Sequence, residues 1–183
     1  MTTRHKALLI SASDYDEPGI SSLPFVRDDL QRLATALTDR GFHSAEIAEH
    51  RRGITLNFVK DQVSRFLREA RRDDTLFILL SGHGQHFQGT DYLIPEDASF
   101  QVHPFADSCV PLDLSKQLNE CAAAQVGVGV SSRMSTTEPT SWTRVIPIGG
   151  PGSGSACGSP GRRWVATARQ ARSTGPRAGA PRR

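Results

Sequence analysis

The sequence predicts an α/β protein built on a doubly wound, mainly parallel sheet. Residues 6–12 and 75–81 are short, nearly continuous apolar segments that stop at turn-forming residues, which is typical of strands buried on both faces of a parallel sheet. Between them lie two amphipathic segments long enough to form the helical crossovers that parallel strands require. The predicted order is therefore strand, helix, strand, helix, strand.

The spacing of apolar residues predicts the two helices and the strand between them. The first helix has Asp28 and Asp29 in its first turn and stops at Gly41. Its apolar face consists of Leu30, Leu33, Ala34 and Leu37. Residues 42–50 alternate weakly between apolar and polar and predict a strand, and residues 55–72 predict the second helix. The apolar face of that helix consists of Phe58, Val63, Phe66, Leu67 and Ala70.

Further elements are predicted after the central strand. Residues 86–94 read as a hairpin that turns at Gly89 and is ended by Pro95. Residues 111–124 predict a third helix, and residues 125–130 predict the next strand, although two glycines weaken its interior. After this strand the pattern of secondary structure runs out.

Composition divides the chain near Val126. Residues 1–126 hold 13 Lys and Arg against 18 Asp and Glu, a formal charge of −5, whereas residues 127–183 carry a charge of +8. The second segment also contains ten of the 16 glycines and six of the 11 prolines, but no Phe or Tyr. Such a composition buries too little apolar surface to offset its chain entropy. We therefore expect an ordered domain over residues 1–126 and a disordered tail over residues 127–183.

Several classes of protein are excluded or disfavoured by the same composition. No apolar run approaches the roughly 18 residues that a membrane span needs, so a transmembrane protein is excluded. Three cysteines at irregular spacing do not form a disulfide framework, which indicates a reducing compartment. The N-terminal segment has no small-residue cleavage pattern, and we therefore expect a cytoplasmic location.

His83 is the strongest candidate for a catalytic residue. It follows a predicted strand, and ligands of open α/β sheets bind outside the carboxyl ends of the strands. Gly82 and Gly84 let the backbone turn, so we expect the imidazole to be displayed at the rim of the sheet, where it can transfer protons near neutral pH. The N–H of Gly84 could stabilise a developing oxyanion.

Two motifs around this histidine resemble a known family. Ser-Gly-His-Gly at residues 81–84, followed by Gly-Thr-Asp-Tyr-Leu-Ile-Pro-Glu-Asp-Ala at residues 89–98, is similar to the large-subunit domain of caspase-like proteases of the metacaspase and orthocaspase type. Residues 6–15 and 26–37 resemble the first strand and helix of that family, and the resemblance spans about residues 5–126. It implies a cysteine endopeptidase that cuts after a charged residue and needs no cofactor for its chemistry.

The resemblance assigns roles to two residues and leaves the nucleophile without a cysteine. It implies that His83 activates a thiol and that the N–H of Gly84 contributes to the oxyanion hole. The family's cysteine follows the next parallel strand, about 50 residues beyond the histidine, and Ser132 stands at that place. A hydroxyl is far harder to deprotonate than a thiol. Val130 stands where metacaspases have an acid that holds a basic substrate residue, so the resemblance does not carry specificity for Arg or Lys over to this chain.

The three cysteines of the chain fit the nucleophile poorly. Cys121 falls on the predicted third helix, where a small buried apolar residue is expected. Cys109 lies in a loop and nothing marks it as reactive. Cys157 lies in a turn-like sequence but is 74 residues past His83 and follows no apolar strand. Cys157 and Ser132 are therefore weak candidates, and the domain is predicted to be truncated before its nucleophile.

Alternatives remain open at other residues. His83, His86 and His103 could be imagined as a zinc site, but their spacing matches no usual ligand pattern, so no metal is predicted. Asp14, Asp16 and Glu17 read as a solvated loop that could attract a basic substrate residue. The compositional break near residue 126 is compatible with a change of reading frame.

These residues favour one function and leave two others open. The first hypothesis is a caspase-like cysteine endopeptidase acting on peptides or proteins, impaired because a thiol is missing at the expected place. The second is a catalytically inactive relative that serves as a binding module. In a third, the arginine-rich tail contacts the phosphates of a nucleic acid, but the tail lacks an organised basic helix or aromatic platform, which disfavours it.

Overall fold

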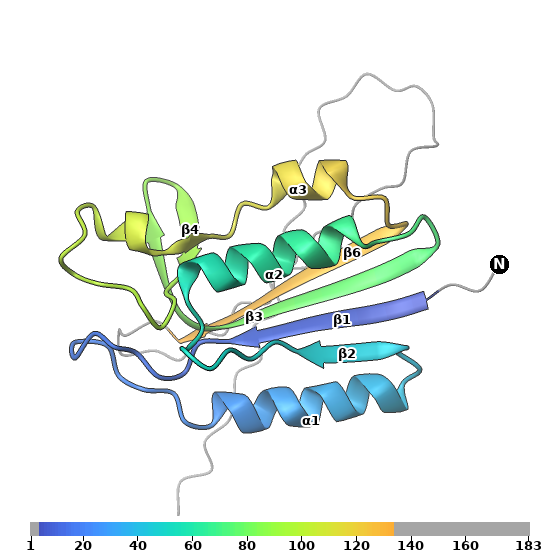
Figure 1. Cartoon of the computed structure of the whole chain (residues 1–183), viewed down its shortest axis with the longest axis horizontal. Coiled ribbons are helices and arrows are strands. Elements are labelled where there is room, and N and C mark those ends of the chain that lie inside the picture. The colour runs from blue at the N-terminus through green and yellow to red at the C-terminus, as the bar shows by residue number, and fades with distance from the viewer. Residues whose placement is uncertain (1–3, 134–183) are drawn as a thin grey trace, which may run out of the picture.

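The computed structural model describes residues 4–133 and shows helices packed on both faces of a central sheet (Figure 1). In chain order its elements are β1 (Arg4–Ser11), α1 (Val26–Asp39), β2 (Ser44–Ile47), α2 (Leu56–Arg68), β3 (Asp74–Phe87), β4 (Thr90–Leu93), the 3-10 helix η1 (Phe105–Ser108), β5 (Val110–Pro111), α3 (Ser115–Glu120) and β6 (Gln125–Arg133). Most of the segment predicted to be a disordered tail, residues 134–183, lies outside the described residues.

The six strands form one mixed sheet. Four of them are parallel, because β1 pairs with β2 and β3, and β3 pairs with β6 on its other side. The antiparallel strands β4 and β5 extend the sheet from the second half of β3. Helix α1 covers one face, and α2 and α3 cover the other (Figure 1). The α/β class is therefore confirmed, with a mixed sheet in which the parallel strands carry the crossovers.

The continuous apolar run of β1 is explained by burial on both faces. Leu8 and Ile10 contribute to the cluster beneath α2 and α3, whereas Ala7 and Leu9 pack toward α1. Each of these four side chains is at most 1% exposed. A strand with only one buried face would alternate between apolar and polar residues instead.

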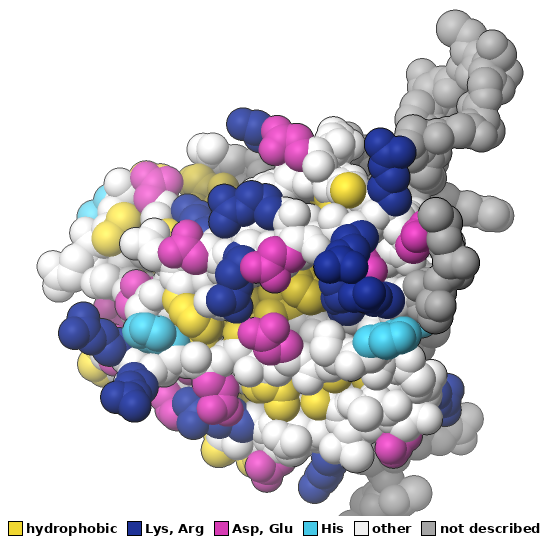
Figure 2. Space-filling model, turned by 45° about the vertical axis from the view of Figure 1, so that its right-hand side comes forward, with side chains coloured by type: hydrophobic (Ala, Val, Ile, Leu, Met, Phe, Trp, Pro, Cys, Tyr) yellow, Lys and Arg dark blue, Asp and Glu magenta, His cyan; other side chains and the backbone are white. Residues whose placement is uncertain are grey.

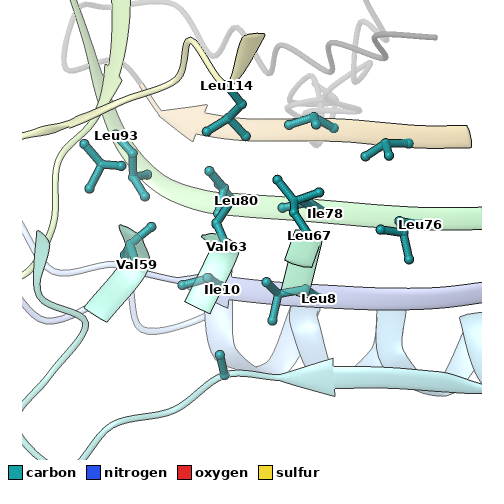
Figure 3. Close-up of a cluster of buried hydrophobic side chains, with 14 of the residues drawn as sticks. Leu8, Ile10, Val59, Val63, Leu67, Leu76, Ile78, Leu80, Leu93 and Leu114 are labelled. Atoms are coloured by element: carbon teal, nitrogen blue, oxygen red, sulfur yellow. The ribbon is translucent and has the colours of Figure 1, made fainter. Parts of the chain in front are cut away.

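The main core lies between the sheet and helices α2 and α3 (Figure 3). Burying each large aliphatic side chain stabilises the fold by about 1.5–3 kcal/mol, so this cluster is a principal source of stability. The members that the figure labels come from β1, β3, β4, α2 and the residue before α3: Leu8, Ile10, Val59, Val63, Leu67, Leu76, Ile78, Leu80, Leu93 and Leu114. Within the described residues, no helix combines the length and apolar character needed to cross a membrane.

Strand β3 is longer than its apolar core predicts. The strand was expected to end at Ser81, but it continues as far as Phe87 because its second half gains a new partner in β4. The hairpin predicted around Gly89 is confirmed, and Gln88 and Gly89 both have positive φ, at 48° and 79°. Two positive φ values in a two-residue turn match the twist of antiparallel strands.

The third helix is shorter than predicted. It was expected over residues 111–124, but α3 spans only Ser115–Glu120. Pro111 belongs to β5 instead, and the carboxylate of Asp113 accepts a hydrogen bond from the N–H of Ser115 at 3.0 Å at the start of the helix. The helix ends because Cys121 is extended and the N–H of Ala124 bonds to the carbonyl of Asp74 at 3.0 Å, which leads the chain into β6.

Strand β6 crosses the compositional break. It was expected to end at residue 130, with the domain boundary at residue 126, but its pairing with β3 continues to Arg133. A Cβ at Gly127 or Gly129 would lie 3.5 Å from Phe77 or 3.1 Å from Leu79 respectively. The side chains of Phe77 and Leu79 thus cover the glycines. Backbone pairing with β3 and the packing of Phe77 and Leu79 over the glycines explain why a glycine-rich segment completes the parallel part of the sheet.

Candidate functional site

The candidate site lies at the carboxyl edge of the parallel strands. From β1 the chain passes through α1 to β2 on one side, and from β2 it returns through α2 to β3 on the other side of β1. The connections that leave β1 and β3 consequently lead to helices on opposite faces, which is the switch point where open α/β sheets bind ligands. Ser81 of β3 is the register partner of Ser11, the last residue of β1. His83, two residues farther on, therefore lies at the predicted edge.

The ring of His83 is held by the loop between β1 and α1. Its Nε2 lies 2.8 Å from the carbonyl oxygen of Ser21. A carbonyl can only accept, so this nitrogen carries the proton, and Nδ1 of the neutral ring is the atom that can take a proton from a nucleophile. A backbone carbonyl thus sets the tautomer that a general base needs.

The surroundings of the ring correct one expectation. The imidazole was predicted to be displayed openly at the rim, but His83 is only 7% exposed. The chain does not turn at the two glycines that flank it either, because β3 continues through them. Instead the loop after β1 lies over the strand and supplies Ser21 and Tyr15 as contacts for the ring.

Tyr15 is a contact that the sequence analysis missed. Its hydroxyl accepts a hydrogen bond from the N–H of His83 at 2.9 Å and donates one to the carbonyl of Ala12 at 3.0 Å. Its ring centroid lies 5.1 Å from that of His83. Burial raises the pKa of Tyr15 to about 12, while the hydrogen bond from His83 lowers it and the charge of Glu96 raises it further. The hydroxyl is therefore neutral and can donate and accept at once.

The backbone of Gly84 is oriented by the hairpin. The N–H of Ile94 bonds to the carbonyl of His83 at 2.9 Å, and Gly84 and Leu93 are opposite each other in the β3–β4 ladder. In an antiparallel ladder with this bond, Gly84 and Leu93 are a pair that exchanges no hydrogen bonds. The N–H of Gly84 thus points away from β4, toward the side on which β6 ends.

Strand β6 brings the expected place of the nucleophile next to these residues. Its register sets Ser132 opposite Gly82 and Arg133 opposite His83. Gly82 has a φ of 154°, and a Cβ there would lie 3.1 Å from the carbonyl oxygen of Ala12 and from the hydroxyl of Tyr15. A side chain at residue 82 would therefore disturb the contacts that hold His83. The next parallel strand along the chain is β6, but it ends at Arg133, so Ser132 lies within this strand and not after it as predicted.

Neither cysteine of the described residues stands at the expected place of the nucleophile, and Cys109 is held as a thiol by burial. Burial raises the pKa of the Cys109 thiol to about 11, while its hydrogen bond with Ser108 lowers this pKa and the charge of Asp97 raises it. Cys109 is 2% exposed and packs in a small cluster. Cys121 was predicted on a helix but lies just after α3, where its thiol points to the carbonyl of Leu67 at 3.5 Å. Cys157 lies outside the described residues.

A buried carboxylate anchors the same edge and was also missed. Glu96 is 4% exposed, and its Oε1 accepts hydrogen bonds from the N–H groups of Ser13 and Asp14 at 2.7 and 3.1 Å. Its Oε2 accepts one from the N–H of Ile54 at 2.6 Å. Glu96 therefore ties the loop after β1, which carries Tyr15, to the segment that precedes α2.

The other candidates form no site of their own. Asp14 is exposed and lies 3.6 Å from the guanidinium of Arg27, and Glu17 accepts a hydrogen bond from the N–H of Phe100 at 3.0 Å. His86 pairs with Asp91 at 2.7 Å on the exposed hairpin. Over residues 4–133, no group of three or more His, Cys, Asp or Glu side chains could hold a metal ion, so His83, His86 and His103 are not brought together.

The edge of the sheet also contains a cavity. It has a volume of about 510 Å³ and lies against the carboxyl ends of β1 and β2 and the first turns of α1. Its lining includes Ser11, Arg27, Asp28, Glu49 and Arg51, so both signs of charge surround it.

Charge on the surface is mixed. Figure 2 shows Lys and Arg side chains interspersed with Asp and Glu on the face drawn there. The basic tail for which a nucleic-acid contact was considered lies mostly outside the described residues. The chain matches no protein-family model and no curated protein sequence.

Proposed function

We propose that the chain is a caspase-like cysteine endopeptidase domain whose hydrolysis is impaired because a serine stands in place of the thiol. One observation carries the proposal. A histidine held by a backbone carbonyl through Nε2 lies at the switch point of the sheet, and the neighbouring parallel strand sets the backbone of Ser132 opposite Gly82, the residue before this histidine. The resemblance of residues 81–84 and 89–98 to the caspase-like family supports the same function.

In the proposed reaction, a nucleophile at residue 132 attacks the carbonyl carbon of a peptide bond and gives its proton to Nδ1 of His83. The N–H of Gly84 stabilises the negative oxygen of the tetrahedral intermediate. The imidazolium then returns the proton to the leaving amine, and a water molecule activated by His83 hydrolyses the acyl intermediate. With a serine hydroxyl as nucleophile, the first proton transfer is far less favourable than with a thiol, so we expect wild-type turnover near background.

A restored thiol tests the proposal. We expect Ser132→Cys to hydrolyse fluorogenic peptides that end in Arg, Lys or Asp, and we expect His83→Ala in the same background to abolish the turnover. Ser131→Cys is the matched control, because it adds the same thiol one residue earlier on β6, opposite Ser81 rather than Gly82. Equal rates for the two cysteine variants would contradict the proposal.

Two observations favour a second function, that of a binding module without catalysis. His83 is buried, and the raised pKa of Cys109 keeps its thiol protonated. This function predicts that the fluorogenic peptides bind to the chain without being cut. Fluorescence anisotropy of the same peptides measures it. Saturable binding to the wild-type chain, together with no turnover by Ser132→Cys, would favour the module over the peptidase.

A further inference from the structure

We propose that Tyr15 is a positioning residue for His83, acting through its hydroxyl group. The proposal concerns the geometry of the described residues, and its consequence for turnover rests on the peptidase function proposed above. The contacts that hold His83 include one from Ser21 to its ring, one from Ile94 to its carbonyl and one from Tyr15 to its N–H. Only the last of these contacts is made by a side chain.

The hydroxyl of Tyr15 couples two segments that are far apart in sequence. It donates to Ala12, at the end of β1, and accepts from His83, so one group links the β1 edge to the backbone of the base. The N–H of Ala12 also bonds to the carbonyl of Ser81 at 2.9 Å, so β1 and β3 are joined on either side of Gly82. Gly82, the residue before His83, is thus held between two cross-strand contacts.

The loop that carries Tyr15 is itself held in place. Glu96 binds the N–H groups of Ser13 and Asp14, and its own carbonyl accepts a hydrogen bond from the N–H of Asp16 at 2.9 Å. The residues on both sides of Tyr15 are therefore fixed. A rigid support of this kind is what a side chain needs in order to position another residue.

The chain contains only two tyrosines, which supplies a matched control. Tyr92 belongs to β4 and packs in the same small cluster as Tyr15 and Cys109. Its register partners are Gln85 and Pro111, not His83. Tyr92→Phe removes a hydroxyl from the same cluster without removing the bridge to His83.

The test compares Tyr15→Phe with Tyr92→Phe in the full chain. We expect the His83 amide to exchange with solvent about five- to tenfold faster in Tyr15→Phe, because a lost hydrogen bond is worth on the order of 1 kcal/mol. The ¹⁵N shifts of the His83 ring should move as well, with His83→Ala providing the assignment. Exchange and ring shifts that are the same in both tyrosine variants would overturn the proposal.

A measurement on the wild-type chain covers the case in which Tyr15→Phe does not fold. A nuclear Overhauser effect between the Tyr15 hydroxyl proton and the His83 amide proton is expected from the 2.9 Å contact, and its absence would contradict the proposal. In the Ser132→Cys background, Tyr15→Phe should lower kcat about tenfold and leave KM within twofold. If Ser132→Cys shows no turnover, the peptidase proposal fails and the resonance measurements still decide the role of Tyr15.

Discussion

The two ends of the sheet each bury a carboxylate, and they hold it by different means. At the amino edge, Asp74 is 1% exposed and accepts hydrogen bonds from Lys6 Nζ at 2.8 Å and from the N–H of Arg71 at 3.0 Å. At the carboxyl edge, Glu96 is surrounded by backbone N–H groups. No ion pair to Glu96 forms within the part of the chain that the structure describes.

This difference determines which parts of the molecule each carboxylate holds together. A charge pair at the amino edge joins the starts of two neighbouring strands, β1 and β3, and depends on one lysine. Backbone donors at the carboxyl edge come from separate loops, so a single carboxylate fixes the loop after β1, which contacts His83, relative to the segment that precedes α2. The carboxyl edge is therefore where one substitution changes both the stability of the fold and the geometry of the candidate site.

Replacing the carboxylate of the carboxyl edge should have the largest effect. We expect Glu96→Ala to lower the free energy of unfolding by about 3 kcal/mol or more, since hydrogen bonds to a charged group are worth about 1.5–3 kcal/mol each and three donors lose their acceptor. Asp97→Ala is the control, because Asp97 is exposed and accepts one hydrogen bond, from the N–H of Leu56 at 2.9 Å. Urea unfolding measures the free energy of unfolding of both variants. Equal decreases for Glu96→Ala and Asp97→Ala would contradict the role given to Glu96 at the carboxyl edge.

At the amino edge we expect a smaller, pH-dependent effect. Burial alone would raise the pKa of Asp74, but the hydrogen bonds from Lys6 and Arg71 and the charges of Lys6 and Arg4 hold it below its ordinary value. A lowered pKa in the folded state stabilises the protein above the unfolded value, which is about 3.9, and this contribution is lost as the pH falls below that value. Asp74→Asn should therefore cost about 1–2 kcal/mol at pH 7.

Urea unfolding of the wild type and Asp74→Asn at pH 7 and near pH 3 measures this contribution. The difference in the free energy of unfolding between the two proteins should be smaller at the lower pH, where the aspartate begins to be protonated. A gap that stays constant between the two pH values would show that the charge of Asp74 is not what holds the amino edge.

The smallest effect is expected in the middle of the sheet, between the two edges. Gly129→Ala should destabilise the chain by up to about 1 kcal/mol relative to Gly127→Ala, because its Cβ would lie 3.1 Å from Leu79, whereas the Cβ at residue 127 meets ordinary contact at 3.5 Å. Thermal unfolding of the two variants measures the difference. If Gly129→Ala is the more stable one, Leu79 does not cover β6 as described.

The fold could be predicted from the sequence wherever side chains carry the signal. Helices α1 and α2 and the strands β1 and β3 follow from apolar spacing, and Thr55 begins α2 with the N-cap that its side chain provides to Phe58. The full length of β6 could not be predicted, because composition describes side chains whereas this strand is held by backbone pairing and by the cover of Phe77 and Leu79.

The candidate site divides in the same way. His83 and Gly84 could be predicted because a histidine between glycines after an apolar strand is a pattern of side chains. Ser21 and Glu96 could not, because their contacts run between a side chain and backbone groups of loops up to 83 residues apart. Tyr15 was not predicted, because the interpretation of this loop relied on its acidic residues. Its place soon after a buried strand could have indicated a residue near the site.

The pKa of a thiol introduced by Ser132→Cys tests the central claim most directly, because it reports whether His83 acts on residue 132 without requiring a substrate. The rate of alkylation by iodoacetamide as a function of pH measures it. We expect an apparent pKa below about 8.5, the ordinary value for cysteine, and a return to that value when His83→Ala is added. The same pKa with and without His83 would contradict the claim that the imidazole is poised beside this position.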